Sequence, residues 1–177
     1  MGGRFNHIIT KNIMSDKEEQ FKNIETQLNE QGFKIKDHDF DRPWGGFFVI
    51  EETQAQKFIE TYFNEVEMSE INISGKLSPK ILLVEPGKRL SWQYHHRREE
   101  IWQVIEGPVG VIKSISDEQK PVKEYKEGDQ VRLKRGERHR LVGLKNWGIV
   151  AEVWQHIYGD HPSNEKDIVR LEDDFGR

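Results

Sequence analysis

The chain has 177 residues, enough for one well-cored domain and too few for two comfortable ones. Apolar residues make up 34% and charged residues 33%, but five Trp, nine Phe and four Tyr supply core side chains, which excludes wholesale disorder. A net charge of −4 argues against a general binder of nucleic acid or anionic membrane, so we expect a small-molecule partner.

The absence of cysteine narrows the chemistry further. It excludes disulfides, thiolate metal ligands and cysteine nucleophiles, so a metal must be held by histidine, carboxylate or amide oxygen. No run approaches the roughly 18 apolar residues of a membrane span, and no signal-peptide core begins the chain, so we predict a cytoplasmic protein. Residues 1–13 lack periodicity and precede a second methionine, Met14; whether they belong to the native chain stays open.

The first predicted helix begins at Ser15. Ser15 and Glu18 have the spacing of a capping box, apolar residues then recur at helical spacing, and Gly32 is a natural stop. We therefore divide the chain into an N-terminal extension with its helix, residues 1–32, and one main domain, residues 33–177.

A second helix is predicted over residues 53–67, inserted into the main domain. Thr53 and Gln56 form another candidate capping box. Apolar side chains form one stripe, which indicates core packing: Phe58, Ile59, Tyr62, Phe63 and Val66.

Most of the remaining chain predicts short strands separated by turn residues such as Pro-Gly and Gly-Pro. Because no strand-helix-strand alternation appears after residue 79, the pattern indicates a mainly β sandwich or barrel. The predicted strands are Trp44–Ile50, Lys80–Val84, Leu90–Tyr94, Ile101–Ile105, Val109–Ile115, Gln130–Leu133, Arg140–Leu144 and Ile149–Tyr158.

Four polar residues form a candidate metal site. Gln93 and His95 are two apart, so on a strand both point to one face. If the chain turns and pairs back, Glu100 can lie opposite them, and His139 opens a later strand after a glycine turn. One amide oxygen, two imidazoles and one carboxylate suit a divalent first-row metal with positions left open. The alternative is that these groups only hydrogen-bond one another.

The two segments around these residues resemble the two cupin motifs. The first motif is matched by Gly87, Gln93, His95, Glu100 and Gly107, and the second by Gly128, Gly136 and His139. The resemblance implies a mainly β cupin barrel, a jelly roll or double-stranded β-helix, with two flanking N-terminal helices. Cupins also often pair as homodimers.

Gln93 in the first ligand position is similar to the phosphomannose isomerases. Residues 42–50 and 79–177 resemble the type II mannose-6-phosphate isomerase domain, which is often fused to a mannose-1-phosphate guanylyltransferase. The resemblance implies interconversion of mannose 6-phosphate and fructose 6-phosphate with one divalent ion, zinc being expected and manganese, iron, cobalt or nickel open. The chain departs from the family in having Arg97 and Ile101 where histidines are common.

Basic side chains are the candidates for binding a sugar phosphate. Lys80 shares the strand face of Leu82 and is expected to point into the barrel. Arg89, Arg98 and Arg170 are phosphate candidates, together with the run 132–140, which has five Lys or Arg against one acid. A solvated loop face is the alternative for that run.

The catalytic candidates are Arg98, Arg170 and Glu172. Arg98 shares the face of Glu100 and could neutralise an enediolate or assist proton transfer. Glu172 is a candidate base if the tail, residues 167–177, folds over the barrel mouth, anchored by Ile168 and Leu171. An ordinary acidic terminus is the alternative.

The sequence thus favours a metal-dependent aldose-ketose isomerase. A non-catalytic sugar- or metabolite-binding cupin is the alternative. A metal-dependent oxygenase is a third reading, which Gln93 fits less well because such sites are commonly rich in histidine. The sugar, the native metal, the base and the oligomeric state stay open.

Overall fold

The structure is a computed structural model that describes residues 15–63, 71 and 75–177. Two α-helices, α1 (Asp16–Glu30) and α2 (Ala55–Tyr62), and a short 3-10 helix, η1 (Glu52–Gln54), precede most of the strands. The strands in these ranges are β1 (Ile35–Arg42), β2 (Gly45–Ile50), β3 (Lys80–Val84), β4 (Trp92–Tyr94), β5 (Arg98–Glu106), β6 (Val109–Ser114), β7 (Lys123–Tyr125), β8 (Gln130–Leu133), β9 (Arg138–Gly143), β10 (Gly148–His156) and β11 (Val169–Glu172).

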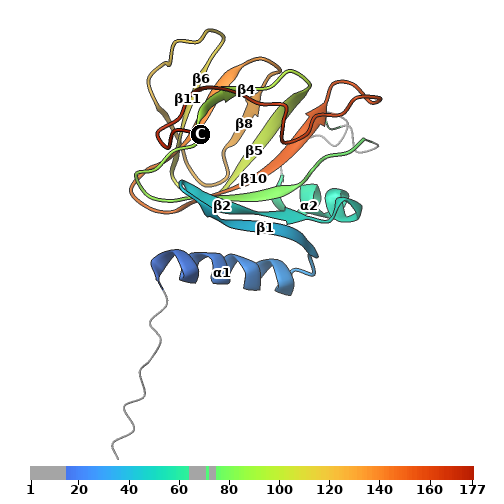
Figure 1. Ribbon diagram of the computed structural model, residues 1–177. Coiled ribbons are helices and arrows are strands. Elements are labelled where there is room, and N and C mark those ends of the chain that lie inside the picture. Colours follow the sequence, from blue (N-terminus) through green and yellow to red (C-terminus); the bar gives the residue numbers. More distant parts are fainter. Residues whose placement is uncertain (1–14, 64–70, 72–74) are drawn as a thin grey trace, which may run out of the picture.

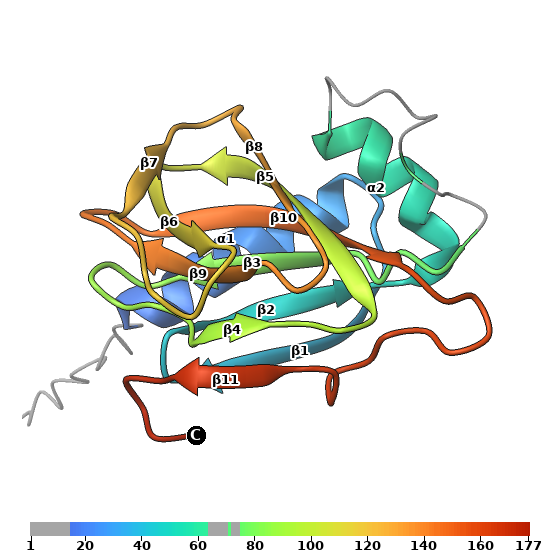
Figure 2. The same ribbon diagram turned by 90° about the horizontal axis from the view of Figure 1, so that it is seen from above.

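The strands form two antiparallel sheets. One has the order β1-β2-β3-β10-β5-β8 and the other β11-β4-β9-β6-β7. In Figure 1, α1 lies under β1 and β2, on the side away from β4 and β11. Figure 2 shows β11 beside β4 along one margin of the barrel.

Alternation along the central strands separates two cores. On β3, Leu82 and Val84 face the second sheet and pack with Trp102 and Val150. The intervening side chains face the helices, and their core includes Phe21 and Leu28 from α1 and Phe58 from α2, with Ile81, Leu83, Ile149 and Ala151 from the sheet. The helices therefore cover the outer face of the larger sheet and leave the barrel interior to the site.

The first helix is confirmed at both ends. It begins at Asp16, Ser15 Oγ accepts a hydrogen bond from the Glu18 N–H at 3.2 Å, and the helix ends at Glu30. Gly32 follows with φ +80°, a left-handed conformation that glycine adopts without strain. The boundary between residues 32 and 33 stays a prediction, although α1 shares its core with the sheet.

The second helix differs from its prediction. It begins as η1 and ends at Tyr62, and residues 64–67 of the predicted range lie outside the described residues. Its N-cap is Gln54 without a side-chain hydrogen bond, so the predicted box of Thr53 and Gln56 is wrong. The apolar stripe is confirmed as core at Phe58, Ile59 and Phe63.

All eight predicted strands are present, most with ends displaced by a few residues. The largest displacement is in β5, which begins at Arg98 directly after a tight turn. Three strands were not predicted, namely β1, β7 and β11. All three lie at sheet edges and carry partly exposed, polar side chains, so they lack the apolar alternation that identifies inner strands.

The described helices also bear on the location of the chain. Neither α1 nor α2 has the length and apolar character that crossing a bilayer requires.

Candidate metal centre and cavity

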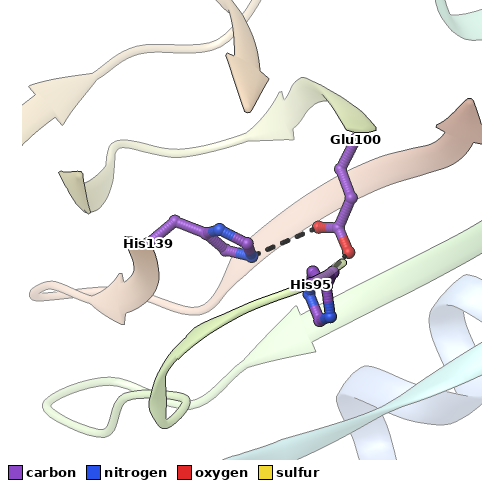
Figure 3. A group of neighbouring side chains, drawn as sticks. All are labelled: His95, Glu100 and His139. Carbon is purple, nitrogen blue, oxygen red and sulfur yellow. Dashed lines mark ion pairs between the residues drawn. The ribbon is translucent and has the colours of Figure 1, made fainter. Parts of the chain in front are cut away.

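Three of the four predicted ligands meet inside the barrel. His95 follows the end of β4, Glu100 lies on β5 and His139 on β9, and all three side chains are buried. Figure 3 shows both imidazoles turned toward the Glu100 carboxylate. His95 Nε2 lies 3.1 Å from Glu100 Oε1, and His139 Nε2 lies 3.6 Å from Glu100 Oε2.

The backbone fixes the orientation of both histidines. His95 Nδ1 lies 2.6 Å from the carbonyl oxygen of Asp167, and His139 Nδ1 lies 2.9 Å from that of Glu137. A carbonyl can only accept, so each Nδ1 carries the proton and each Nε2 presents a lone pair to Glu100. This is the arrangement in which imidazoles ligate metals through Nε2.

The three residues fit a divalent cation. Glu100 Oε2 and His139 Nε2 are buried and have no hydrogen-bond partner, an arrangement that costs about 1–3 kcal/mol per group unless something else satisfies it. Two ligand atoms about 2.1 Å from a common ion lie about 3–4 Å apart, which matches both distances to Glu100. His95, Glu100 and His139 therefore form a group that could hold a metal ion.

Gln93 lies beside this group. Its residue pairs with His139 across β4 and β9, and its side chain lines the same cavity as Glu100. Gln93 Oε1 accepts a hydrogen bond from Ser91 Oγ at 2.5 Å. Its role as a fourth ligand stays a prediction.

Arg98 is built into the centre. Its buried guanidinium donates to Glu100 Oε1 at 2.8 Å and to His95 Nε2 at 3.1 Å, and it stacks 3.7 Å from the ring centroid of Trp154. It also donates to Ser163 Oγ at 3.0 Å, which ties the centre to the segment before the tail. The prediction that Arg98 shares the face of Glu100 is confirmed.

These neighbours set the charge of the centre. Burial by itself would raise the pKa of Glu100, but Arg98, followed by His95 and His139, outweighs burial and holds that pKa well below its usual value. Burial lowers the pKa of His139 to about 4, against the opposing effect of Glu100. At neutral pH the centre thus presents a carboxylate and a neutral imidazole, the forms in which both residues ligate metals.

A cavity of about 150 Å³ opens beside the centre. Gln93, Glu100 and Arg98 line its inner end. Cations outnumber acids in its wall, where Arg42, Lys80, Arg98, Arg170 and Arg177 stand against Glu100, Glu152 and Glu165. Such a wall suits a small, polar, anionic molecule.

Two of the predicted substrate contacts line this cavity besides Arg98. Lys80 is buried, as the parity of β3 predicts, and pairs with Glu165. Arg170 also lines the cavity. The sequence prediction did not include Arg42 or Arg177, because the cavity wall is assembled from distant segments.

Other predicted residues lie elsewhere. Arg89 makes two hydrogen bonds to the Asp174 carboxylate, at 2.6 and 2.9 Å. Glu172 accepts from Gln119 and has a half-exposed side chain. Neither of them, nor any residue of the basic run 132–140, is among the cavity-lining residues, so the structure does not place these candidates against a ligand in this cavity. Arg140 from that run is instead fully buried and donates to the backbone of Leu90 and Glu172.

The tail contributes to the cavity, although by a different anchor from the predicted one. β11 pairs with β4, and Ile168, Arg170 and Arg177 line the cavity. Leu171 is 39% exposed, so its predicted anchoring role is wrong. The anchor is Asp167, whose carboxylate accepts from the backbone N–H groups of His96 and Arg97, both at 3.0 Å, and from Ser163 Oγ at 2.5 Å.

We expect Asp167→Asn to lower the free energy of unfolding of the metal-free protein by about 2 kcal/mol at pH 7. Burial would raise the pKa of Asp167, but the three donors lower it to about 2, so the folded state favours the carboxylate. This contribution is present above pH about 4 and is lost as pH falls toward 2, because the unfolded chain takes up the proton first. Urea unfolding at several pH values measures it. A difference from wild type that is the same at pH 7 and pH 2.5 would show that charge is not the cause.

Sequence reasoning missed one buried acid in the cavity wall, Glu152. Its carboxylate accepts from the indole N–H of Trp102 at 2.8 Å and of Trp154 at 2.9 Å. Burial raises the pKa of Glu152 to about 8, and the nearby Glu100 acts in the same direction. A signal was available, since a glutamate interrupts the apolar run of β10 two residues before Trp154, on the same strand face.

The two facing antiparallel sheets with a buried His/Glu group between them define a cupin fold, and solved structures agree. Capsular polysaccharide assembling protein CapF from Staphylococcus aureus aligns over 77% of this chain and 34% of its own, with a TM-score of 0.52 at 16% identity. Oxalate decarboxylase from Bacillus subtilis aligns over 76% of this chain and 30% of its own, with a TM-score of 0.52 at 17% identity. The predicted cupin barrel with two N-terminal helices is confirmed.

Residues 55–173 match the family described as mannose-6-phosphate isomerase C-terminal, and the chain belongs to this family. Xanthan biosynthesis protein XanB from Xanthomonas campestris pv. campestris is 34% identical over 60% of this chain and 21% of its own length. Alginate biosynthesis protein AlgA from Pseudomonas syringae pv. tomato is 28% identical over 92% of this chain and 28% of its own. Mannose-1-phosphate guanylyltransferase ManC from Salmonella typhimurium is 32% identical over 60% of this chain and 21% of its own. The chain thus spans about a quarter of the length of these relatives.

Proposed function

We propose that the chain is a metal-dependent aldose-ketose isomerase of a sugar phosphate, with mannose 6-phosphate and fructose 6-phosphate as the expected pair. One observation carries the proposal: the buried His95, Glu100 and His139 group, with two unsatisfied ligand atoms, lies beside a cavity walled by five cations. Family membership supports the reaction class. The names of the relatives, which refer to polysaccharide biosynthesis and to mannose 1-phosphate, support a sugar phosphate as the substrate class.

Gln93, His95, Glu100 and His139 would hold one divalent ion, for which zinc is our first expectation. When bound, the ion would supply positive charge beside the oxygens on which negative charge develops during isomerisation. The remaining steps concern the chain's own residues.

The isomerisation moves a proton between adjacent carbons through an enediolate. Arg98 lines the cavity next to Glu100 and would stabilise the negative oxygen by charge. Arg170, with Arg42 and Arg177 on the same cavity wall, would bind the phosphate, since guanidinium groups match its oxygens in pairs. Lys80, paired with Glu165, would contact sugar hydroxyls.

A non-catalytic sugar-binding cupin is the second candidate function. It is favoured by the contacts of Arg98, which already satisfies His95 Nε2 and Glu100 Oε1. In such a protein the guanidinium would stand in place of a metal ion, and the same cavity would bind a sugar phosphate without turnover.

The two candidates are distinguished by one assay of the purified chain. The protein is stripped with a chelator, dialysed, reloaded with zinc, manganese, iron(II), cobalt or nickel, and given a panel of hexose, pentose and heptose phosphates. We expect isomerisation of at least one aldose phosphate that disappears on stripping and returns with at least one metal. Saturable binding of a sugar phosphate, with no product under any metal, would contradict the isomerase and support the binder.

A further inference from the structure

Glu152 is the buried acid that the proposed function leaves without a task. It lies in the middle of β10, between Lys80 of β3 and Trp102 of β5, each of which is its register partner. Its side chain is 6% exposed and lines the cavity. It therefore belongs to the wall that a substrate would touch.

The register places Glu152 near the metal group but outside it. Trp154, two residues further along β10, pairs with Glu100, so Glu152 and Glu100 are diagonal neighbours on the same inner face. Diagonal neighbours in antiparallel sheets lie about 7–8 Å apart at the backbone, which leaves room for a small molecule to contact both side chains.

The carboxylate of Glu152 is held rigidly yet keeps acceptor capacity. Each oxygen accepts one indole N–H, from Trp102 or Trp154, and an ionised carboxylate oxygen can accept more than one hydrogen bond. The Trp154 ring is in turn held between two cations, with Lys80 Nζ at 4.3 Å and the Arg98 guanidinium carbon at 3.7 Å from its centroid. Such fixed donors orient a catalytic group at no further cost when the substrate binds.

A purely structural role explains this arrangement poorly. A well-packed apolar side chain in a core is commonly no less stabilising than a buried charge, so a buried acid is weak support for stability. The neighbours of Glu152 on the same face, Leu82, Val150 and Val104, are apolar. Where the wall meets the cavity, the acid replaces them.

We propose that Glu152 is the catalytic residue that moves the proton between the two carbons of the substrate. The inference rests on the proposed function. As a carboxylate, Glu152 removes the proton from the carbon that bears the hydroxyl. The electron pair of that C–H bond forms a carbon-carbon double bond, and the carbonyl pair moves onto its oxygen, giving an enediolate. Glu152 then delivers the proton to the former carbonyl carbon, while the hydroxyl proton passes from one sugar oxygen to the other. No oxidant or reductant is needed.

The test compares Glu152→Gln with wild type and with Glu99→Gln, a matched control on β5 whose side chain is exposed. Three quantities are measured: divalent metal per chain, the Kd of a non-reacting sugar-acid phosphate, and deuterium incorporation into the sugar phosphate in D₂O by NMR. We expect Glu152→Gln to keep the metal and bind the analogue within about threefold, while isomerisation and deuterium incorporation fall about 10²–10⁴-fold. The control should match wild type in all three.

Glu152→Asp is the second variant, in case the amide disrupts the indole contacts and the glutamine variant does not fold. It keeps the charge but withdraws the carboxylate by one methylene, and we expect a loss of about 10²-fold in turnover with metal content unchanged. Full turnover in either variant, or a weakening of analogue binding that accounts for the whole loss, would overturn the role of Glu152 while leaving the isomerase intact. A wild-type chain inactive on every sugar phosphate would overturn both, so the two failures are distinguishable.

Discussion

His139→Ala should no longer bind a stoichiometric divalent ion, with the Kd weakened at least about 100-fold. The structure gives the reason, because His139 Nε2 is buried, has no hydrogen-bond partner and faces Glu100 Oε2 at 3.6 Å. Removing this imidazole leaves an incomplete shell of ligands on one side of the ion. Metal analysis by mass spectrometry after dialysis against each ion measures the effect.

His96→Ala is the control for that experiment. His96 follows the ligand His95 directly, but its side chain is exposed, so its removal should leave metal content unchanged. A His139→Ala protein that is folded and retains one ion per chain would show that His139 is not a ligand.

Arg98→Met should destabilise the metal-free protein by about 3–5 kcal/mol, because it leaves the buried Glu100 carboxylate without its cation. A bound divalent ion would neutralise the same carboxylate. Metal should therefore stabilise Arg98→Met more than it stabilises wild type, and the two proteins should become closer in stability when loaded. Turnover should fall as well, since the guanidinium lines the cavity.

Chemical unfolding with and without metal measures the Arg98→Met effect. Arg135→Met is the matched control, since Arg135 is exposed and its printed contacts are to Tyr158 alone, and a surface change of this kind is expected to fall within about 0.5 kcal/mol. If metal stabilises Arg98→Met and wild type equally, Arg98 and the ion do not share the task of neutralising Glu100.

The sequence was sufficient for the features set by local pattern. The parity of Gln93 and His95, the carboxylate after the turn and the histidine after Gly136 predict a group that the barrel does bring together at His95, Glu100 and His139. Inner strands such as β3 and β8 were predicted to the residue, because apolar alternation and flanking turns define them. The Ser15 cap was likewise readable from spacing alone.

Features that depend on distant pairing were not readable. The basic run 132–140 is dense in sequence, yet its Arg140 turns to the backbone of Leu90 and Glu172. The cavity's cations come instead from places as far apart as Arg42 and Arg177. Asp167 as an anchor depends on the turn at His96 lying beside it, a contact across about 70 residues that no local pattern records.

The most direct test of the metal centre is a crystal structure of the protein grown with zinc or manganese, with anomalous data collected at the absorption edge of that metal. A single peak is expected about 2.0–2.2 Å from His95 Nε2, Glu100 Oε2 and His139 Nε2, with Gln93 Oε1 as a fourth contact. In that structure Arg98 should have released His95 Nε2. An empty centre under excess metal, with Arg98 still donating to both His95 and Glu100, would contradict the metal site and favour a cupin that binds its ligand without an ion.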